Sequence, residues 1–146
     1  MAISSLGYMG ITSRDPQAWL RLGVDLLGMV PVHALPGEYR GLPGDPDSAG
    51  PASGGSGIGP DGSAYLKLDD WEWRVAVHKT DGPEGLAYLG FDTDNARSFA
   101  ETVASLRAAG VAVEIADRAS ARARSVTQLA RLQDPAGNAI ELFWGP

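Results

Sequence analysis

The sequence of 146 residues contains no cysteine and only two histidines, His33 and His78. The lack of cysteine excludes disulfide bonds, thiolate nucleophiles and metal sites built from sulfur ligands. Two histidines leave little material for a metal centre that needs several imidazoles. Any chemistry in this chain must therefore rely on carboxylates, hydroxyls and aromatic side chains.

Positive charge is also scarce, because 12 lysines and arginines face 18 aspartates and glutamates, for a net charge of -6. Without a basic cluster to offset phosphate charge, we expect no nucleic-acid partner and no anionic membrane partner. Arg118, Arg122 and Arg124 come nearest to a basic run, and we expect them on a solvated helical or loop face. No apolar run approaches the roughly 20 residues of a membrane span. No secretory signal is visible at the start, so we expect a cytoplasmic protein.

The two halves of the chain repeat one pattern. Residues 6–11 (LGYMGI) correspond to residues 86–91 (LAYLGF), and a helical stretch follows each of them. The composition, 44% apolar and 21% charged, is typical of a globular domain. A duplication of this length usually means two copies of one supersecondary unit, packed as a pair with a cavity between their sheets.

The first copy starts with a predicted strand at 5–12. A helix follows, with Asp15 as N-cap, Pro16 at its first position and Gly28 as its end. The helical spacing predicts an inward apolar face made of Trp19, Leu20, Leu22, Val24 and Leu27. Strands are predicted at 30–35, 64–68 and 73–78. The intervening residues 36–62 are about half Gly or Pro, which predicts a long mobile loop.

The second copy repeats this order. We predict a strand at 86–92 and a helix at 94–109 that ends at Gly110. The remaining strands are predicted at 111–115, 127–133 and 139–144. A turn at 134–138 joins the last two, since Pro135 presets it and Gly137 permits a positive φ. Each copy is thus βαβββ, and the chain is one domain (1–146) with modules 1–80 and 86–146.

The ending, residues 134–143 (DPAGNAIELF), together with the repeated strand and helix, resembles the vicinal oxygen chelate superfamily. The segments at 66–78 and 86–91 are most similar to the N-terminal domain of type I extradiol ring-cleavage dioxygenases. This resemblance implies an α+β fold in which two tandem βαβββ modules form a half-open, glyoxalase-like barrel with a central cleft. It also implies that residues 144–146 stand where a linker to a catalytic second domain would begin.

Metal-binding members of the superfamily present His and Glu ligands from the first and last strands of each unit. The resemblance assigns these positions to Tyr8, Tyr88 and Glu141, with Val77 or, after a one-residue slip, His78 as the fourth. Successive strand residues face opposite sides, so only one of Val77 and His78 points inward, and the alignment favours Val77.

These residues do not suit a mononuclear non-haem iron centre, which needs two imidazoles and one carboxylate. Glu141 alone is too few ligands, and phenols with a pKa near 10 are poor substitutes at neutral pH. His33 is predicted at the far end of the second strand, and His78 on the surface. We therefore expect no metal and no cofactor in this chain, and the resemblance places Fe(II) in a catalytic partner domain or subunit.

Each candidate residue also has a plainer role. Glu141 can be a structural carboxylate, while Tyr8 and Tyr88 can fill the cleft and form hydrogen bonds. The tryptophans can stack on an aromatic ligand or pack against a neighbouring domain; they include Trp71, Trp73 and Trp144. Asp69 and Asp70 are predicted to stabilise a turn.

Three functions remain open, and no residue is assigned firmly to catalysis. The favoured one is a non-catalytic domain that supports an extradiol dioxygenase and its oligomer contacts. The second is a stand-alone protein that sequesters an aromatic small molecule in a cleft lined by Tyr8, Tyr88, Glu141, Trp73 and Val77. The third is a metal-independent enzyme with Glu141 as base and Tyr8 or Tyr88 as proton donor. Whichever function holds, we expect the chain to form a homodimer or a higher oligomer.

Overall fold

The computed structural model describes residues 3–32, 58–59 and 61–145. His33 and most of the predicted loop at 36–62 lie outside these residues. The chain divides into two compact units: unit one is Met1–Met9 with Leu86–Pro146, and unit two is Gly10–Gly85. Strand β1 (Ser5–Ser13) belongs to both, since its first residues fall in unit one and its last in unit two.

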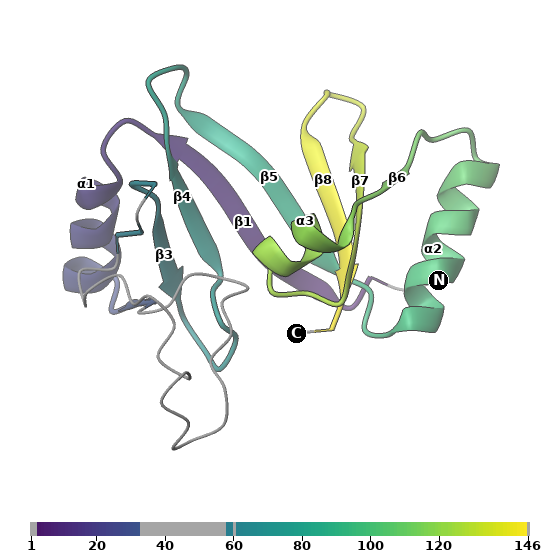
Figure 1. The fold of residues 1–146 in the computed structure, drawn as a ribbon, viewed down its shortest axis with the longest axis horizontal. Coiled ribbons are helices and arrows are strands. Elements are labelled where there is room, and N and C mark those ends of the chain that lie inside the picture. The colour runs from purple at the N-terminus through teal and green to yellow at the C-terminus, as the bar shows by residue number, and fades with distance from the viewer. Residues whose placement is uncertain (1–2, 33–57, 60, 146) are drawn as a thin grey trace. The chain divides into compact units, whose positions relative to one another are not determined.

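Unit one is built on strands in the order β1-β5-β8-β7-β6 (Figure 1). Strand β5 (Gly85–Asp92) pairs in parallel with β8 (Ala139–Trp144), and β8 pairs antiparallel with β7 (Gln128–Gln133). Strand β6 (Glu114–Ile115) pairs antiparallel with β7. The central position of β8 thus places its side chains between two neighbouring strands.

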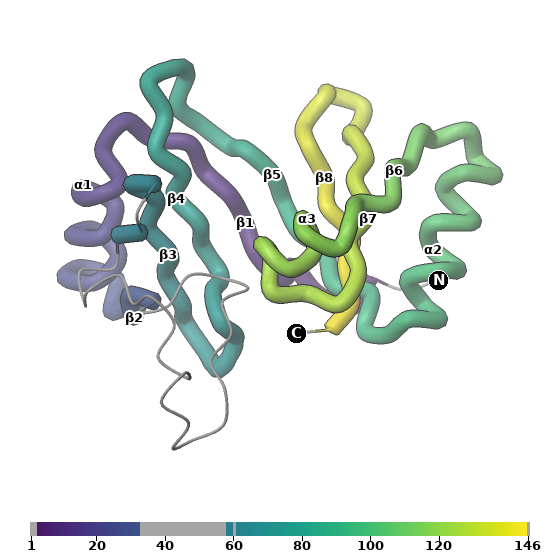
Figure 2. The backbone as a smooth tube through the Cα atoms, in the orientation of Figure 1, coloured from purple at the N-terminus to yellow at the C-terminus, as the bar shows by residue number. Residues whose placement is uncertain are grey.

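Two helices accompany these strands. Helix α2 (Ala96–Ala108) packs on β7 and β8 through a core of Phe99, Val103, Ala130 and Leu142. Helix α3 (Arg118–Ala123) is short and leads into β7. Figure 2 traces β1 and β5 running beside each other before the chain enters α2.

Unit two has strands in the order β2-β3-β4-β1. Its elements are α1 (Pro16–Leu20), the π-helix η1 (Arg21–Leu26), β2 (Val30–Pro31), β3 (Ala64–Lys67) and β4 (Val75–Lys79). Strands β3 and β4 pair antiparallel, with Ala64 opposite Val77. Ala64, Leu66, Ala76 and Val77 are almost fully buried, so this hairpin forms the core of the unit.

The predicted α+β class is confirmed, and so are the start of the first helix and the glycines that end both helices. The Asp15 carboxylate accepts a hydrogen bond from the Ala18 backbone N–H at 3.0 Å, with Pro16 at the first helical position. Gly28 and Gly110 have φ of 70° and 83°, as left-handed helix ends require. Gly137 in the last turn has φ of 86°.

Other predictions need correction. The predicted strand at 111–115 shortens to Glu114–Ile115, and helix α3 was not predicted. The second helix begins at Ala96, because Asn95 caps it by accepting a hydrogen bond from the Ser98 N–H at 2.9 Å. Strand β4 begins at Val75 rather than at residue 73.

The inward face predicted for the first helix is wrong for two of its five residues, whereas Trp19 and Val24 are half-buried. Leu20 is buried, but Leu22 and Leu27 are 40% and 59% exposed. The reason is the π-helical winding of η1, in which the Leu27 N–H donates to the Leu22 carbonyl at 3.1 Å. Because the predicted face assumed 3.6 residues per turn, the wider winding rotates the leucines away from the sheet.

Glycines on the central strands of unit one make room for aromatic rings. A Cβ atom on Gly90 of β5 would clash with the ring of Tyr8, and one on Gly7 would clash with the ring of Phe143. Tyr8 can therefore lie flat over the β5 backbone only because residue 90 has no side chain. This close approach positions the Tyr8 hydroxyl for the contacts described below.

We predict that Gly90→Ala lowers the free energy of unfolding by about 1–3 kcal/mol, since the added methyl overpacks a buried ring. Gly82→Ala is the matched control, because its Cβ would meet only the Thr80 hydroxyl at 3.5 Å, and we expect a change below about 0.5 kcal/mol. Urea denaturation of both variants measures the difference. Equal stabilities would contradict the close packing of Tyr8 on Gly90.

Candidate functional site

Three of the predicted site residues come together in unit one. Tyr8 lies on β1, Tyr88 on β5 and Glu141 on β8, which are neighbouring strands. Their exposed fractions are 3%, 7% and 3%, so all three are buried. A buried glutamate is rare unless a partner compensates its charge, and the surroundings of Glu141 therefore decide what this site can do.

Both carboxylate oxygens of Glu141 are engaged by donors. The Tyr8 hydroxyl donates to Oε2 at 2.7 Å. The Arg124 guanidinium donates from Nε to Oε2 at 2.9 Å and from Nη2 to Oε1 at 3.1 Å. Arg131 Nε lies 3.6 Å from Oε1. This two-pronged guanidinium–carboxylate pairing is the strongest kind of hydrogen-bonded ion pair that side chains form.

Aromatic rings enclose this ion pair. The guanidinium carbon of Arg124 lies 4.0 Å from the centre of the Tyr88 ring, in cation–π geometry. Tyr8 meets Tyr88 edge to face at 5.9 Å and stacks on Phe143 at 4.8 Å. Glu141, Arg124 and the three rings thus form one packed group, which we call the Glu141 cluster.

Helix α3 delivers Arg124 to this cluster. The Asp117 carboxylate caps the helix by accepting from the Ser120 N–H at 2.8 Å. Arg124 is its C-cap residue, and Ser125 then turns the chain with a φ of 59°. The Val126 N–H donates back to the Ala121 carbonyl at 3.1 Å, which ties the turn to the helix. The helix end is thereby held where the guanidinium can reach β8.

The cluster shifts the pKa of two of its members. Burial raises the pKa of the Tyr8 hydroxyl far above its usual value near 10, and the negative charge of Glu141 raises it further. Burial is the largest single influence on Arg124 and would lower its pKa, but the hydrogen bond to Glu141 and the electrostatic attraction of Tyr88, Glu141 and Tyr8 together raise the pKa. Tyr8 is therefore a persistent proton donor in a hydrogen bond and a poor acid.

The donor set does not fit a divalent metal. Among the described residues, no three His, Asp or Glu side chains gather within reach of one ion. Glu141 already accepts bonds from Tyr8 and Arg124, and a metal bound to it would lie beside a fixed guanidinium. The metal cation and the guanidinium would repel each other strongly, because water is excluded from this site.

The other predicted site residues lie in unit two. Val77 is fully buried and Trp73 is 3% exposed, with its ring edge on to Tyr65 at 5.6 Å. His78 is half-buried and contacts the Tyr65 ring edge on at 6.1 Å, so it is less exposed than predicted. Asp69 serves its turn as predicted, since its carboxylate accepts from the Trp71 N–H at 3.1 Å.

Arg124 is the residue that the sequence analysis placed wrongly. Arg118 and Arg122 are exposed as predicted, but the Arg124 side chain is only 16% exposed. A signal for it was present, because Glu141 stands between apolar residues on a predicted inward strand and needs a positive partner. Which of the arginines would supply that partner depends on the turn at Ser125, which has no distinctive sequence pattern.

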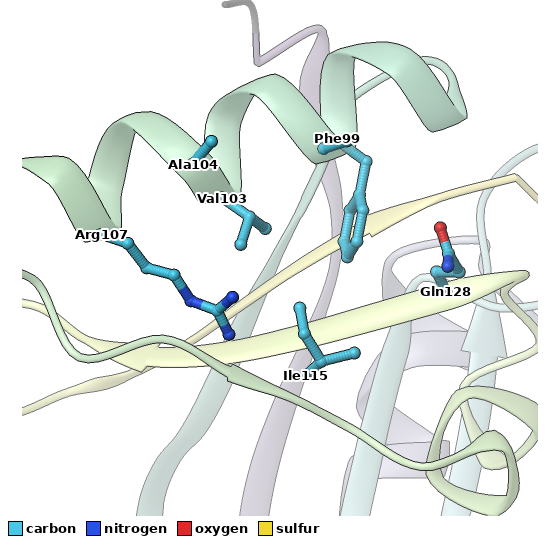
Figure 3. Close-up of a pocket in the computed structure, with 7 residues that line it drawn as sticks. Phe99, Val103, Ala104, Arg107, Ile115 and Gln128 are labelled. Atoms are coloured by element: carbon cyan, nitrogen blue, oxygen red, sulfur yellow. The ribbon is translucent and has the colours of Figure 1, made fainter.

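A groove of about 300 Å³ lies elsewhere in unit one, between α2 and the strands β6 and β7 (Figure 3). Phe99, Val103 and Ile115 give it an apolar floor. The Arg107 guanidinium at its edge donates to the Val113 carbonyl at 2.9 Å, and the Gln128 side-chain oxygen accepts from the Trp144 indole N–H at 2.7 Å. Its polar groups therefore serve the surrounding structure.

We expect Arg124→Met to lower the free energy of unfolding by about 3–5 kcal/mol, since the buried carboxylate loses its hydrogen-bonded counter-charge and keeps only the longer contact to Arg131. Arg122→Met replaces an arginine on the exposed side of α3 and should change the free energy of unfolding by less than about 0.5 kcal/mol. Thermal or urea unfolding of the two variants provides the comparison. Similar losses would mean that Arg124 is not the partner of Glu141.

Tyr8 should make the stability depend on pH in the alkaline range. Above about pH 10 the unfolded chain releases the Tyr8 proton while the folded chain retains it, so the free energy of unfolding falls by up to about 1.4 kcal/mol per pH unit. Tyr8→Phe removes this contribution. Unfolding curves measured between about pH 8 and pH 11.5 should therefore be flatter for Tyr8→Phe, and parallel curves would refute the expectation.

Comparison with known proteins identifies relatives along nearly the whole chain, although no family model matches it. Biphenyl-2,3-diol 1,2-dioxygenase of Sphingomonas paucimobilis is 33% identical over 146 residues, which cover 100% of this chain and 40% of that protein. The iron-dependent extradiol dioxygenase of Rhodococcus jostii (strain RHA1) is 32% identical over 145 residues, which are 99% of this chain and 40% of that protein. The chain thus spans about two fifths of the length of these relatives.

Solved structures agree with this result. The crystal structure of a catechol 2,3-dioxygenase matches with a TM-score of 0.79 and 29% identity, over 100% of this chain and 43% of that one. The Mn(II)-bound glyoxalase from Novosphingobium aromaticivorans shares the fold, with a TM-score of 0.65 and 19% identity over 97% of this chain and 39% of that one. Among the described residues, none of the helices has the length and apolar character needed to cross a bilayer.

The predicted resemblance is therefore confirmed: the chain has the vicinal oxygen chelate fold, its homologues are extradiol dioxygenases, and it matches their N-terminal domain.

Proposed function

We propose that this chain is an iron-free domain of an extradiol dioxygenase, and that it supports an aromatic ring-cleavage reaction carried out by iron held outside these residues. The observation that carries the proposal is the pairing of Glu141 with Arg124 and Tyr8. At the strand positions where the superfamily offers metal ligands, this chain has two phenols, and its one carboxylate is neutralised by a guanidinium.

The Arg124 guanidinium supplies the positive charge that a metal would otherwise provide. A buried carboxylate needs one positive partner, and Arg124 meets this need with two hydrogen bonds in a ring-lined setting. For iron to bind, Glu141 would have to release these bonds and leave the guanidinium buried without a partner. That loss would have to be recovered from a single carboxylate ligand, which is too little.

The relatives suggest where the iron-bearing part belongs. This chain spans about two fifths of their length, which leaves the other three fifths for a catalytic domain or subunit. Since the relatives are dioxygenases of biphenyl-2,3-diol and 1,2-dihydroxynaphthalene, we infer an aromatic vicinal diol as the substrate class of the whole assembly. This chain would contribute packing surface to that assembly and no reacting group.

The geometry favours this role over the two alternatives. A metal-independent enzyme needs Glu141 as a base, but both of its carboxylate oxygens already accept hydrogen bonds from Tyr8 and Arg124. A binding protein for aromatic molecules needs Tyr8 and Tyr88 to face a ligand, whereas their exposed fractions are 3% and 7%. Both alternatives would require the Glu141 cluster to open.

The proposal predicts the iron content of the 146-residue chain. After anaerobic incubation with excess Fe(II) and desalting, we expect far less than one iron per chain and no cleavage of catechol or 2,3-dihydroxybiphenyl. Glu141→Gln should leave the residual iron unchanged, as should the control Glu114→Gln on the exposed strand β6. Iron near one equivalent that is lost in Glu141→Gln and kept in Glu114→Gln would overturn the proposal.

A further inference from the structure

Unit two presents apolar side chains to solvent along η1 and the residues that follow it. Leu26 is 76% exposed, Leu27 59%, Val30 47% and Leu22 40%. We call these four residues the leucine face. Single exposed leucines are ordinary, but several that follow one another along a single helix mark a contact surface.

The outward direction of these residues is built into the helix. A Cβ atom on Gly23 would lie 2.7 Å from Leu66 Cδ1, so η1 approaches the β3 side chains through its glycine. Rotating the helix to bury the leucines would force a side chain into this contact. The i→i+5 hydrogen bond from the Leu27 N–H to the Leu22 carbonyl also aligns these two leucines along the axis.

Charges beside the leucine face suggest what covers it. Arg21 and Asp25 are both exposed and lie four residues apart on η1. The Arg21 side chain is 62% exposed, and among the described residues it has one long ion-pair contact, at 4.0 Å to the equally exposed Asp15. A helix with one positive and one negative residue beside an apolar centre is complementary to itself when the second copy runs antiparallel, the arrangement that a two-fold axis perpendicular to the helices produces.

We propose that two copies of this chain associate through their leucine faces, with η1 antiparallel to its counterpart and Arg21 of each copy facing Asp25 of the other. The leucines then occupy the apolar centre and the charges the rim, as in most protein interfaces. Contacts based on one helix fall short of the roughly 800 Å² per partner that a stable complex buries, so we expect dissociation in the micromolar range. The association is independent of iron and of the role proposed above.

Sedimentation equilibrium of the 146-residue chain, from about 1 µM to about 500 µM, tests this interface because that range brackets a micromolar dissociation constant. We expect a monomer–dimer equilibrium that Leu26→Glu weakens at least about tenfold, since a charge then enters the apolar centre. Leu86→Glu is the matched control, because Leu86 is a 50% exposed leucine of unit one that is not part of the leucine face, and it should change nothing. A chain that stays monomeric throughout, or equal effects of the two variants, would overturn the proposal.

A charge exchange tests the antiparallel arrangement. Arg21→Glu and Asp25→Arg should each weaken association several-fold, since like charges then face each other. The double variant restores opposite charges and should return to within about threefold of the original dissociation constant. Circular dichroism checks that all variants are folded, which their exposed positions favour. A double variant no better than the single ones would rule out the Arg21–Asp25 contact.

Discussion

The ion pair between Arg124 and Glu141 is the interaction on which the interior of unit one depends. Glu141 is only 3% exposed, and a carboxylate buried to this extent cannot remain charged without a partner. The end of helix α3 supplies the missing cation, and Tyr8 and Tyr88 close around it. The result is a buried carboxylate whose two oxygens both accept hydrogen bonds from side chains of unit one.

Most of the fold could be predicted from the sequence, because its signals are local. Alternation marked β1, β5 and β8, and Asp15-Pro16, Gly28 and Gly137 act through their own backbone geometry. The elements that were missed depend on contacts made elsewhere in the chain. Helix α3 is too short to show periodicity, and the π-helical winding of η1 reflects the close approach of Gly23 to Leu66.

The candidate site, too, could be predicted from the sequence only in part. The resemblance to the vicinal oxygen chelate superfamily assigned Tyr8, Tyr88 and Glu141 to equivalent strand positions, and they lie together in unit one. Arg124 was expected in solvent because its neighbours Arg118 and Arg122 are exposed. Three arginines spaced along one short segment look alike in sequence, and only the turn at Ser125 aims the last of them inward. The sequence indicates that Glu141 needs a positive partner, but it does not indicate which arginine lies beside it in the fold.

Strand β1 limits where the chain can be divided into separate parts. The sequence repeats meet between residues 80 and 86, yet Tyr8, from the first repeat, hydrogen-bonds Glu141 of the second. A gene fragment encoding only the second repeat would lack the phenol that covers its own carboxylate. Such a fragment could cover Glu141 only if a second chain supplied a strand with a phenol in the place of Tyr8.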